Sequence, residues 1–282
     1  MTRHERFAAL HEGADIFIVA NAWDTGSARM LAGLGYPALA TTSWGAAIVA
    51  GREDGAGMVS RDVALDHARE IVEATDLPVT ADLEDGFGRS PEAVAQTVRQ
   101  AAAVGLAGCS IEDTTGDAEA PIFSFDQAVA RIKAAADAVQ ALDRPFVLTA
   151  RAENFSFDRP DLDDTIARLQ AFEAVGADCL YAPQLPDLGA VRAVCSAVSK
   201  PVNVVTGLGL PKDTTVAMLA DAGVRRISFG SSLMRVGLAA VRGAAEAVLR
   251  EGEISAVTGG IGFAEAEALV AAGAPSARPV TI

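Results

Sequence analysis

The sequence predicts a (β/α)8 barrel, and three observations support this fold class. Eight short segments rich in β-branched and other apolar residues alternate with amphipathic helical segments. A helix-ending glycine followed directly by an apolar segment recurs as AGLGYPAL, AAVGLAGCS, EAVGADCL and ADAGVRRIS. The length of 282 residues suits a barrel, for which about 250 residues is typical, and no low-complexity linker divides the chain. Repeated β/α units of this kind build a parallel sheet.

The predicted strands are short apolar runs bounded by turn residues or helix ends, as buried parallel strands usually are. They cover residues 16–23, 38–44, 78–85, 109–113, 146–154, 179–184, 201–207 and 226–232.

Helical periodicity occupies the segments between these strands, most clearly 60–75, 91–105, 163–176 and 214–223. N-caps are expected at Ser60, at Ser90 with Pro91 in the first turn, and at Asp213. Glycines that would end helices are Gly35, Gly105, Gly176 and Gly223.

The main alternative fold is a doubly wound open sheet, which would require a glycine-rich phosphate loop after the first strand. The first strand continues into NAWDTGSARM, which is no such loop. We therefore expect one barrel domain over residues 1–282, with 237–282 as a C-terminal helical extension of two helices. These helices would cover the barrel bottom or pack on a neighbouring subunit.

The composition excludes several classes of function. Acidic residues number 37 against 23 basic residues, which gives a net charge of −14. A surface of this sign repels nucleic acid and anionic membranes, and no apolar run is long enough to span a membrane. The N-terminal MTRHERFAALHEG has no apolar signal core, and Cys109, Cys179 and Cys195 have no metal or disulfide spacing. A cytoplasmic protein with structural thiols is expected.

Carboxylates mark the predicted carboxyl ends of strands 3 and 4, where barrel enzymes carry their active sites. Asp82 and Glu84 end strand 3 and alternate on one face, and Glu112 ends strand 4. Asp54 lies in the loop after strand 2. Acids gathered in this way raise one another's pKa unless a cation lies between them, and oxygen-only ligands suit Mg²⁺ or Mn²⁺. The alternative for the neighbouring Asp85 and Asp113 is that they cap turns or helices.

Arg151 ends strand 5 within TARAEN, beside these acids. It either forms a structural ion pair or binds a substrate carboxylate through two parallel hydrogen bonds, and we favour the second role. Asn203 on strand 7 is a further candidate for substrate binding. No histidine, lysine or cysteine is expected at a strand end, which disfavours Schiff-base chemistry and leaves carboxylates, Tyr181, hydroxyls and metal-bound water as proton carriers.

Five ordered motifs carry a resemblance to a known superfamily. NAWDTGSARML, TTSWGAA, TADLEDGFG, IEDTTGD and TARAENF, between residues 14 and 240, resemble the isocitrate lyase/phosphoenolpyruvate mutase superfamily, and most of all its carboxyvinyl-carboxyphosphonate phosphorylmutase-type branch. The resemblance implies a barrel whose last helix is exchanged between subunits, in a dimer of dimers. It also implies Mg²⁺ held by Asp82, with Asp54, Glu84 and Glu112 acting through water.

The same resemblance assigns the substrate side of the site. The backbone amides of Ser43, Trp44 and Gly45 would hold a substrate carboxylate or enolate oxygen, and Arg151 corresponds to the strand-5 arginine. The shared chemistry breaks a bond next to a carbonyl and stabilises the resulting enolate.

Two departures from the family pattern narrow the activity. The lyases carry a lysine-cysteine-glycine-histidine loop after strand 4, where this chain has TTGDAEAPIFSFD. The mutases carry a longer lid there and a histidine on strand 6, where this chain has Pro183. Neither isocitrate lyase nor phosphoryl mutase activity is therefore supported.

The first functional prediction is a Mg²⁺-dependent lyase that cleaves a C–C bond of a small 2-oxo or 2-hydroxy carboxylic acid through a metal-stabilised enolate. Its reaction would be of the oxaloacetate decarboxylase type or like that of acyl-malate and isocitrate lyases. The alternatives are a C–P mutase or hydrolase acting on phosphonopyruvate-like substrates and a non-catalytic 2-oxo-acid-binding paralogue. The predicted catalytic residues are Arg151, Glu112 and Ser43. The predicted substrate-binding residues are Ser43, Trp44, Gly45, Asp82, Arg151 and Asn203, and the predicted metal ligands are Asp82, Asp54, Glu84 and Glu112.

Overall fold

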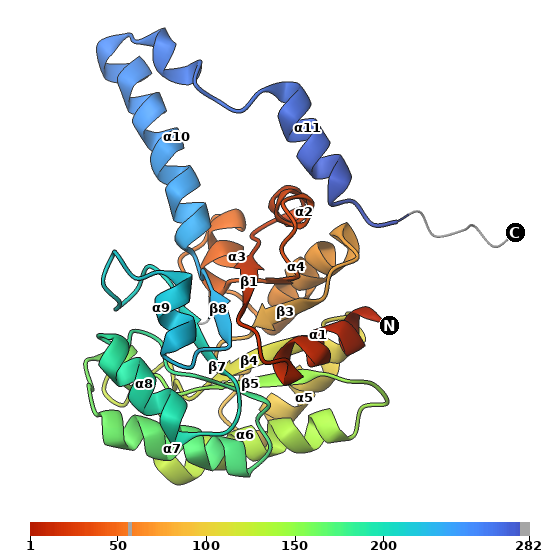
Figure 1. The fold of residues 1–282 in the computed structure, drawn as a ribbon, viewed down its shortest axis with the longest axis vertical. Coiled ribbons are helices and arrows are strands. Elements are labelled where there is room, and N and C mark those ends of the chain that lie inside the picture. The colour runs from red at the N-terminus through yellow and green to blue at the C-terminus, as the bar shows by residue number, and fades with distance from the viewer. Residues whose placement is uncertain (56–57, 277–282) are drawn as a thin grey trace, which may run out of the picture.

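The computed structural model describes residues 1–55 and 58–276, and its centre is a closed barrel of eight parallel strands (Figure 1). Each strand pairs with its neighbour in chain order, and β8 pairs with β1 to close the barrel. The strands are β1 (Phe17–Asn21), β2 (Ala38–Ala40), β3 (Val79–Asp82), β4 (Gly108–Glu112), β5 (Val147–Arg151), β6 (Cys179–Tyr181), β7 (Val202–Val205) and β8 (Arg226–Ser228). All eight predicted strands and the predicted fold class are confirmed.

Helices connect the strands and surround the barrel (Figure 1). They are α1 (Arg3–Glu12), α2 (Thr25–Gly33), α3 (Ser43–Val49), α4 (Arg61–Ala74), α5 (Pro91–Ala103), α6 (Phe125–Gln140), α7 (Leu162–Ala174), α8 (Leu188–Ala197) and α9 (Val216–Asp221), with a short 3₁₀ segment, η1 (Asn154–Phe157), after β5.

Two of the three predicted N-caps are confirmed. The Ser60 and Ser90 side chains accept hydrogen bonds from the amides of Val63 and Ala93, as N-caps do. The prediction of Asp213 as an N-cap was wrong, because Thr215 caps α9 through the Met218 amide. An Asp and a Thr two residues apart are both good caps, so local sequence alone did not separate them.

Apolar side chains fill two layers. Outward-facing strand residues such as Ile111 and Leu148 pack under the surrounding helices in the larger core. Inside the barrel, a smaller cluster containing Phe17 and Val147 fills its amino-terminal end, and Phe7 of α1 completes it. Helix α1 therefore closes the barrel bottom, and polar side chains are left for the opposite, carboxyl end of the strands.

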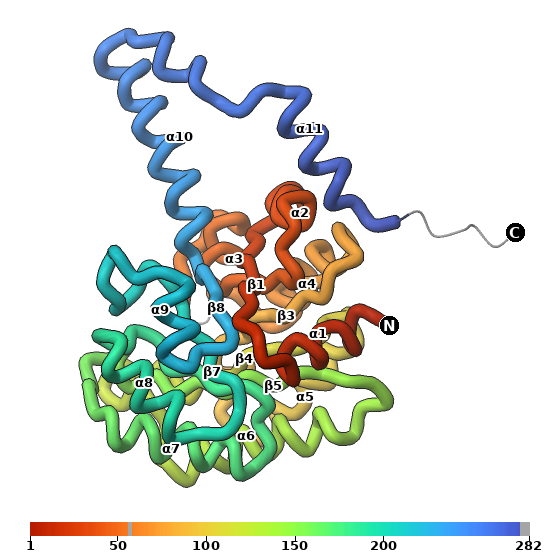
Figure 2. The backbone as a smooth tube through the Cα atoms, viewed as in Figure 1, coloured from red at the N-terminus to blue at the C-terminus, as the bar shows by residue number. Residues whose placement is uncertain are grey.

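The chain continues beyond the barrel as a helical arm (Figure 2). Helix α10 (Ser232–Glu251) extends away from the carboxyl end of β8, a short 3₁₀ segment η2 (Ile254–Val257) follows, and α11 (Phe263–Ala272) returns to α2. The approach of α11 to α2 is close: a Cβ on Gly33 would lie 2.2 Å from the Leu269 carbonyl oxygen.

The two additional C-terminal helices are confirmed, but they do not cover the barrel bottom, because α1 occupies that place. The first of them also begins at Ser232, before the expected boundary at residue 237. Residues 277–282 of the predicted extension lie outside the described part of the chain. Within the described part, no helix is both long enough and apolar enough to cross a bilayer.

Candidate active site

Three charged side chains meet at the carboxyl ends of neighbouring strands. Asp82, Glu112 and Arg151 are the last residues of β3, β4 and β5. The strand register sets Asp82 opposite Ser110 and Glu112 opposite Arg151. Parallel strands in a closed barrel bring their carboxyl ends to one rim, so these residues are brought together as the sequence predicted.

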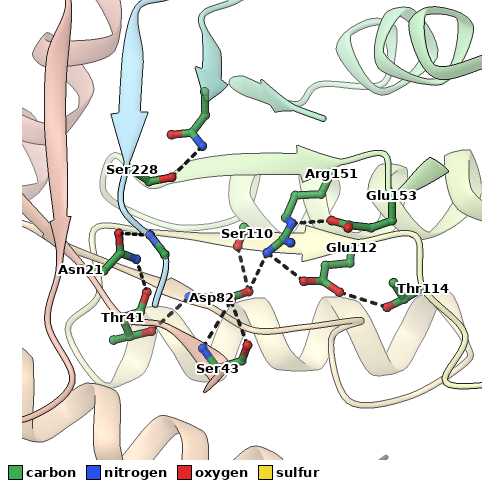
Figure 3. A network of polar contacts seen from close by, with 12 residues as sticks. Asn21, Thr41, Ser43, Asp82, Ser110, Glu112, Thr114, Arg151, Glu153 and Ser228 are labelled. Carbon is green, nitrogen blue, oxygen red and sulfur yellow. Dashed lines mark hydrogen bonds and ion pairs between the residues drawn. The ribbon is translucent and has the colours of Figure 1, made fainter. Parts of the chain in front are cut away.

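Arg151 forms ion pairs with three carboxylates (Figure 3). Its Nη1 lies 3.0 Å from Asp82 Oδ1 and 2.8 Å from Glu112 Oε1, and its Nε donates to Glu153 Oε1 at 2.7 Å. The guanidinium also stacks over the Tyr181 ring, 4.8 Å from its centroid. Arg151 therefore has the ion-pair role, which the sequence left as one of two possibilities. Binding of a substrate carboxylate by Arg151 stays a prediction.

Asp82 is the centre of a second set of hydrogen bonds (Figure 3). Its Oδ2 accepts from the Ser43 hydroxyl at 3.1 Å and from the Ser43 amide at 3.3 Å, and its Oδ1 accepts from the Ser110 hydroxyl at 3.4 Å. The Asp82 amide is fixed in turn by the Thr41 hydroxyl. These donors orient the carboxylate toward the interior of the barrel mouth.

Residues Ser43, Trp44 and Gly45 do not continue strand 2 as predicted. The strand ends at Ala40, and the three residues form the first turn of α3. The missing side chain of Gly45 lets Thr42 and Trp23 approach, since an added Cβ would lie 2.6 Å from Thr42 Cγ2. A turn that is free of the sheet ladder has amides available, and that of Ser43 already binds Asp82.

Glu84 also lies at the barrel mouth, but strand alternation does not bring it there. Strand β3 ends at Asp82, and Glu84 has a left-handed backbone with φ of 49°. Its carbonyl oxygen accepts the Glu112 amide at 2.8 Å, which fastens the turn to β4. Asp82 and Glu84 both lie at the mouth, but the predicted reason, alternation along one strand, was wrong.

A buried arginine that the sequence did not single out holds this acidic turn. Arg131 of α6 donates to the carbonyl oxygens of Asp85 and Gly88, and its guanidinium stacks on the Phe123 ring at 4.2 Å. Left-handed residues such as Glu84 are strained, and surrounding bonds must keep them in place. Only an ordinary amphipathic pattern marks Arg131 in the sequence, so no local signal could have identified it.

The predicted capping roles of two other acids have different outcomes. Asp85 Oδ1 accepts the Phe87 amide and caps the turn, as expected. Asp113 is instead a buried link between strands: it accepts the Glu153 amide and forms an ion pair with Arg168 at 3.0 Å. Because Glu153 also forms an ion pair with Arg151, this link helps to hold the Arg151 guanidinium in place. The sequence places Glu153 at the end of strand 5 but gives it no role, and nothing in the sequence singles out Arg168, because their contacts join residues far apart in the chain.

The acids at the mouth raise one another's pKa. Burial, together with repulsion from Asp82 and Asp54, raises the pKa of Glu84 to about 7. Burial also raises the pKa of Glu112 well above its ordinary value, against the opposing effect of Arg151. Asp54 is largely solvent-exposed at the rim, and partial loss of hydration beside Asp82 raises its pKa. Each of these shifts would be relieved by an added positive charge.

Two cavities meet at this site and share Asp54. The outer one, of about 1280 Å³, is lined by Ser43, Glu84 and Glu112 and by the loop after β4. The inner one, of about 230 Å³, reaches into the barrel past Asp82 and Arg151. Trp44, Tyr181 and Asn203 also line the inner cavity, so every predicted substrate-binding residue except Gly45 borders one of the two.

Asn203 is less free than the prediction assumed. It is 1% exposed, its side-chain amide donates to the Ser228 hydroxyl at 3.0 Å, and its Oδ1 accepts from Arg226 Nε at 2.9 Å. Its remaining surface borders the inner cavity. Substrate binding by Asn203 stays a prediction.

The donor set fits a hard divalent cation that keeps some of its water. Asp54, Asp82, Glu84 and Glu112 offer only oxygen atoms, which suit Mg²⁺. In residues 1–55 and 58–276, no three Asp, Glu, His or Cys side chains are grouped closely enough to hold a metal directly. Arg151 lies between Asp82 and Glu112 instead. Mg²⁺ commonly binds one or two carboxylates and several waters, so direct binding by Asp82 needs no closed cage.

Histidine, lysine and cysteine were not expected at the strand ends. None of these residues lines either cavity in the described part of the chain. His11 lies under the barrel bottom, and Cys109 and Cys179 are buried in the core. Schiff-base and thiol chemistry therefore have no candidate group at this site.

Comparison with known proteins identifies the family. The family model for phosphoenolpyruvate phosphomutase matches residues 7–249. A crystal structure from Burkholderia cenocepacia, of a protein whose name proposes a lyase or mutase activity, is 47% identical, covers 94% of each chain and has a TM-score of 0.90.

Two relatives known from sequence extend the comparison. An uncharacterized protein of Mycobacterium tuberculosis is 30% identical over 86% of this chain and 88% of its own. The oxaloacetate decarboxylase of Bradyrhizobium diazoefficiens is 29% identical over 94% of this chain and 91% of its own. The barrel, its acidic mouth and these matches agree, and the chain belongs to the phosphoenolpyruvate phosphomutase family.

Proposed function

We propose that this protein is a Mg²⁺-dependent lyase that cleaves a C–C bond of a small 2-oxo or 2-hydroxy carboxylic acid. The observation that carries the proposal is the set of acids around Arg151 at the ends of β3, β4 and β5. The likeness to an oxaloacetate decarboxylase over nearly the whole chain supports the same reaction class. Mn²⁺ would serve in place of Mg²⁺, because it accepts the same oxygen ligands.

Each protein group has a task in this proposal. Asp82 would hold the cation directly, and Asp54, Glu84 and Glu112 would bind its waters. When bound, the cation supplies positive charge beside the substrate oxygen on which negative charge develops. Arg151 would orient a substrate carboxylate, because its guanidinium borders the inner cavity and three acids fix its plane.

Cleavage also requires a proton at the carbon that loses its bond. Glu112 lies at the wall of the outer cavity, in contact with Arg151 and the Thr114 hydroxyl, and we assign the proton to its carboxyl group. The Tyr181 phenol borders the inner cavity, and burial raises its pKa, so it stays a neutral O–H donor. Ser43 would present its hydroxyl to the substrate oxygen on which negative charge develops.

A C–P mutase or hydrolase is the second candidate, because the matching family model is that of a phosphomutase. The loop that borders the outer cavity after β4 weakens it. Thr114, Thr115, Gly116, Asp117 and Ala118 carry no positive charge to offset a phosphonate dianion, and the cation that borders this cavity, Arg61, comes from α4 instead.

A panel of substrates tests the proposal. The purified protein is given Mg²⁺ and oxaloacetate, isocitrate, substituted malates or phosphonopyruvate, and 2-oxo acid and phosphate are measured. We expect a 2-oxo acid from at least one hydroxy or oxo diacid, with EDTA abolishing its formation. The Asp82→Asn variant is the matched control, because Mg²⁺ alone promotes oxaloacetate decarboxylation in solution.

The other outcomes of the panel separate the alternatives. Phosphate release from phosphonopyruvate without C–C cleavage would replace the lyase by the C–P enzyme. Ligand-dependent increases in melting temperature without any product would identify a non-catalytic binding protein.

We also propose a homo-oligomer, a dimer of dimers in which the C-terminal arm exchanges its last helix between subunits. Exposed apolar residues along the arm support this association, among them Val241, Leu249 and Phe263, which are 67%, 85% and 91% exposed. Large apolar side chains that are exposed along one arm favour burial by a partner. Light scattering should give a mass of about four chains, and a monomer of unchanged activity would contradict the proposal.

A further inference from the structure

A second buried arginine borders the inner cavity, at the start of β8 and therefore deeper in the barrel than the acids at the strand ends. Arg226 of β8 is 4% exposed, and its hydrogen bonds go to neutral groups only. Its Nε donates to Asn203 Oδ1 at 2.9 Å, and its Nη1 donates to the Thr149 hydroxyl at 2.9 Å and lies 3.3 Å from His11 Nε2. None of the ion pairs in residues 1–55 and 58–276 includes Arg226.

The two arginines of this cavity therefore differ in their counter-charges. Arg151 has three carboxylates within 3.0 Å, whereas Arg226 has none at ion-pair distance in the described residues. His11 supplies no negative charge, and burial beside Arg226 lowers its pKa to about 3. A charge removed from water without a counter-charge is costly. The Arg226 guanidinium is thus positioned to accept an anion.

One hydroxyl of the same cavity lacks a hydrogen-bond partner among the described residues. Thr80 of β3 is 2% exposed, and its hydroxyl oxygen makes no hydrogen bond to any described residue. It borders the inner cavity together with Arg226 and Ser228. Buried hydroxyls are almost always hydrogen-bonded, so this one indicates an occupant of the cavity.

We propose that the inner cavity contains an anion-binding subsite formed by Arg226, Thr80 and Ser228. The chemistry it recognises is a small anion that accepts hydrogen bonds from a guanidinium and hydroxyls. Such an anion is either one carboxylate of the substrate or a free halide. The first source rests on the proposed function and would make a diacid the preferred substrate. The cavity volume of about 230 Å³ accommodates either source together with water.

Bromide provides a direct test that needs no turnover. Crystals of the full chain grown in sodium bromide, without substrate, are measured at the bromine absorption edge. We expect an anomalous peak within hydrogen-bond distance of Arg226 and the Thr80 hydroxyl. An inner cavity that contains only water under these conditions would overturn the subsite.

Two variants are compared, so that the test still stands if one of them fails to fold. Arg226→Gln removes the charge but also disturbs Asn203 and Thr149. Thr80→Val keeps the shape and breaks no bond, because the Thr80 hydroxyl has none. Both should lose the bromide peak, and a peak of unchanged height in either would contradict the assignment. Thr165→Val, at a buried threonine on α7 away from the cavity, is the matched control and should keep it.

Kinetics distinguish the two sources of the anion. If the occupant is a substrate carboxylate, bromide competes with a diacid, and both variants raise its KM, Arg226→Gln by about 10- to 100-fold. The KM of a monocarboxylic 2-oxo acid stays unchanged. If the occupant is a free halide, the bromide peak remains and KM is insensitive to bromide. Since the crystals contain no substrate, failure of the proposed lyase activity leaves the bromide result intact.

Discussion

The mouth and the inner part of the barrel carry opposite excess charge. At the mouth, which is the acidic side, Asp82, Glu112 and Glu153 surround one arginine, so negative groups outnumber positive ones. On the opposite, inner side, Arg226 lies among neutral groups, which include Asn203 and Thr149. Position along the strands sets this difference, because Asp82, Glu112 and Arg151 end their strands, whereas Arg226 begins β8.

This difference explains how a chain with a net charge of −14 can bind an anion. The acidic side needs a cation, and the opposite side already contains one. A substrate with two carboxylates would then meet positive charge at both ends: the divalent cation with Arg151 at the mouth, and Arg226 inside. Such local fields outweigh the net charge of the surface, which acts over longer distances and is screened by salt.

The largest expected effect comes from changing the arginine of the acidic side. Arg151→Lys keeps the positive charge between the acids but loses the planar fork that binds a carboxylate through two hydrogen bonds. We expect kcat/KM to fall by about 100-fold or more, with the fold preserved. Steady-state kinetics with the substrate found in the panel measure the loss, and circular dichroism checks the fold.

The outcome of Arg151→Lys separates two roles. A variant that retains nearly full kcat/KM would show that Arg151 only neutralises the acids. A variant that loses activity but binds the divalent cation as tightly as the parent would support orientation of the substrate.

A smaller effect is expected from the opposite side, through His11. Burial lowers the pKa of His11 from 6.5 to about 3, so the unfolded chain binds a proton that the folded chain does not. The stability that this supplies is present above pH 6.5 and is lost as the pH falls from 6.5 toward 3. Replacing His11 by Gln removes this titration. The free energy of unfolding of the parent should therefore fall more steeply, by about 1.4 kcal/mol per pH unit below 6.5.

Urea unfolding of the parent and of His11→Gln at pH 7.5, 6.5 and 5.5 measures this difference. Only the slopes are compared, because the substitution also removes the packing of the His11 ring against Phe7 and Phe17. Parallel slopes would mean that His11 accepts its proton as easily in the folded chain as in the unfolded one, which would contradict the burial of His11 beside Arg226.

The acidic side could be predicted from the sequence because its main residues are strand ends. A barrel gathers the carboxyl ends of all strands at one rim, so Asp82, Glu112 and Arg151 needed only the correct strand assignment. Ser43 was assigned to a strand because TTSW has β-rich composition, yet the chain leaves the barrel after Ala40 and starts a helix there. Local propensity does not determine such an exit when tertiary contacts compete with it.

The supporting residues could not be predicted, for a different reason. Arg131 and Arg168 lie on helices, and their partners Asp85 and Asp113 follow other strands. Arg226 and Thr80 sit within strands, and whether they face the interior depends on the barrel register, which no short motif encodes. Contacts of this kind appear only once the barrel closes.

The central claim is that Asp82 anchors a divalent cation at the acidic side. Calorimetric titration with Mg²⁺ and Mn²⁺ tests it most directly, on the parent, the isosteric Asp82→Asn variant and the control Asp137→Asn. Asp137 lies on α6 in an exposed ion pair with Lys133. We predict one site per chain in the parent and the control, and at least about 100-fold weaker binding in Asp82→Asn. Equal cation affinity in the parent and Asp82→Asn would contradict the claim.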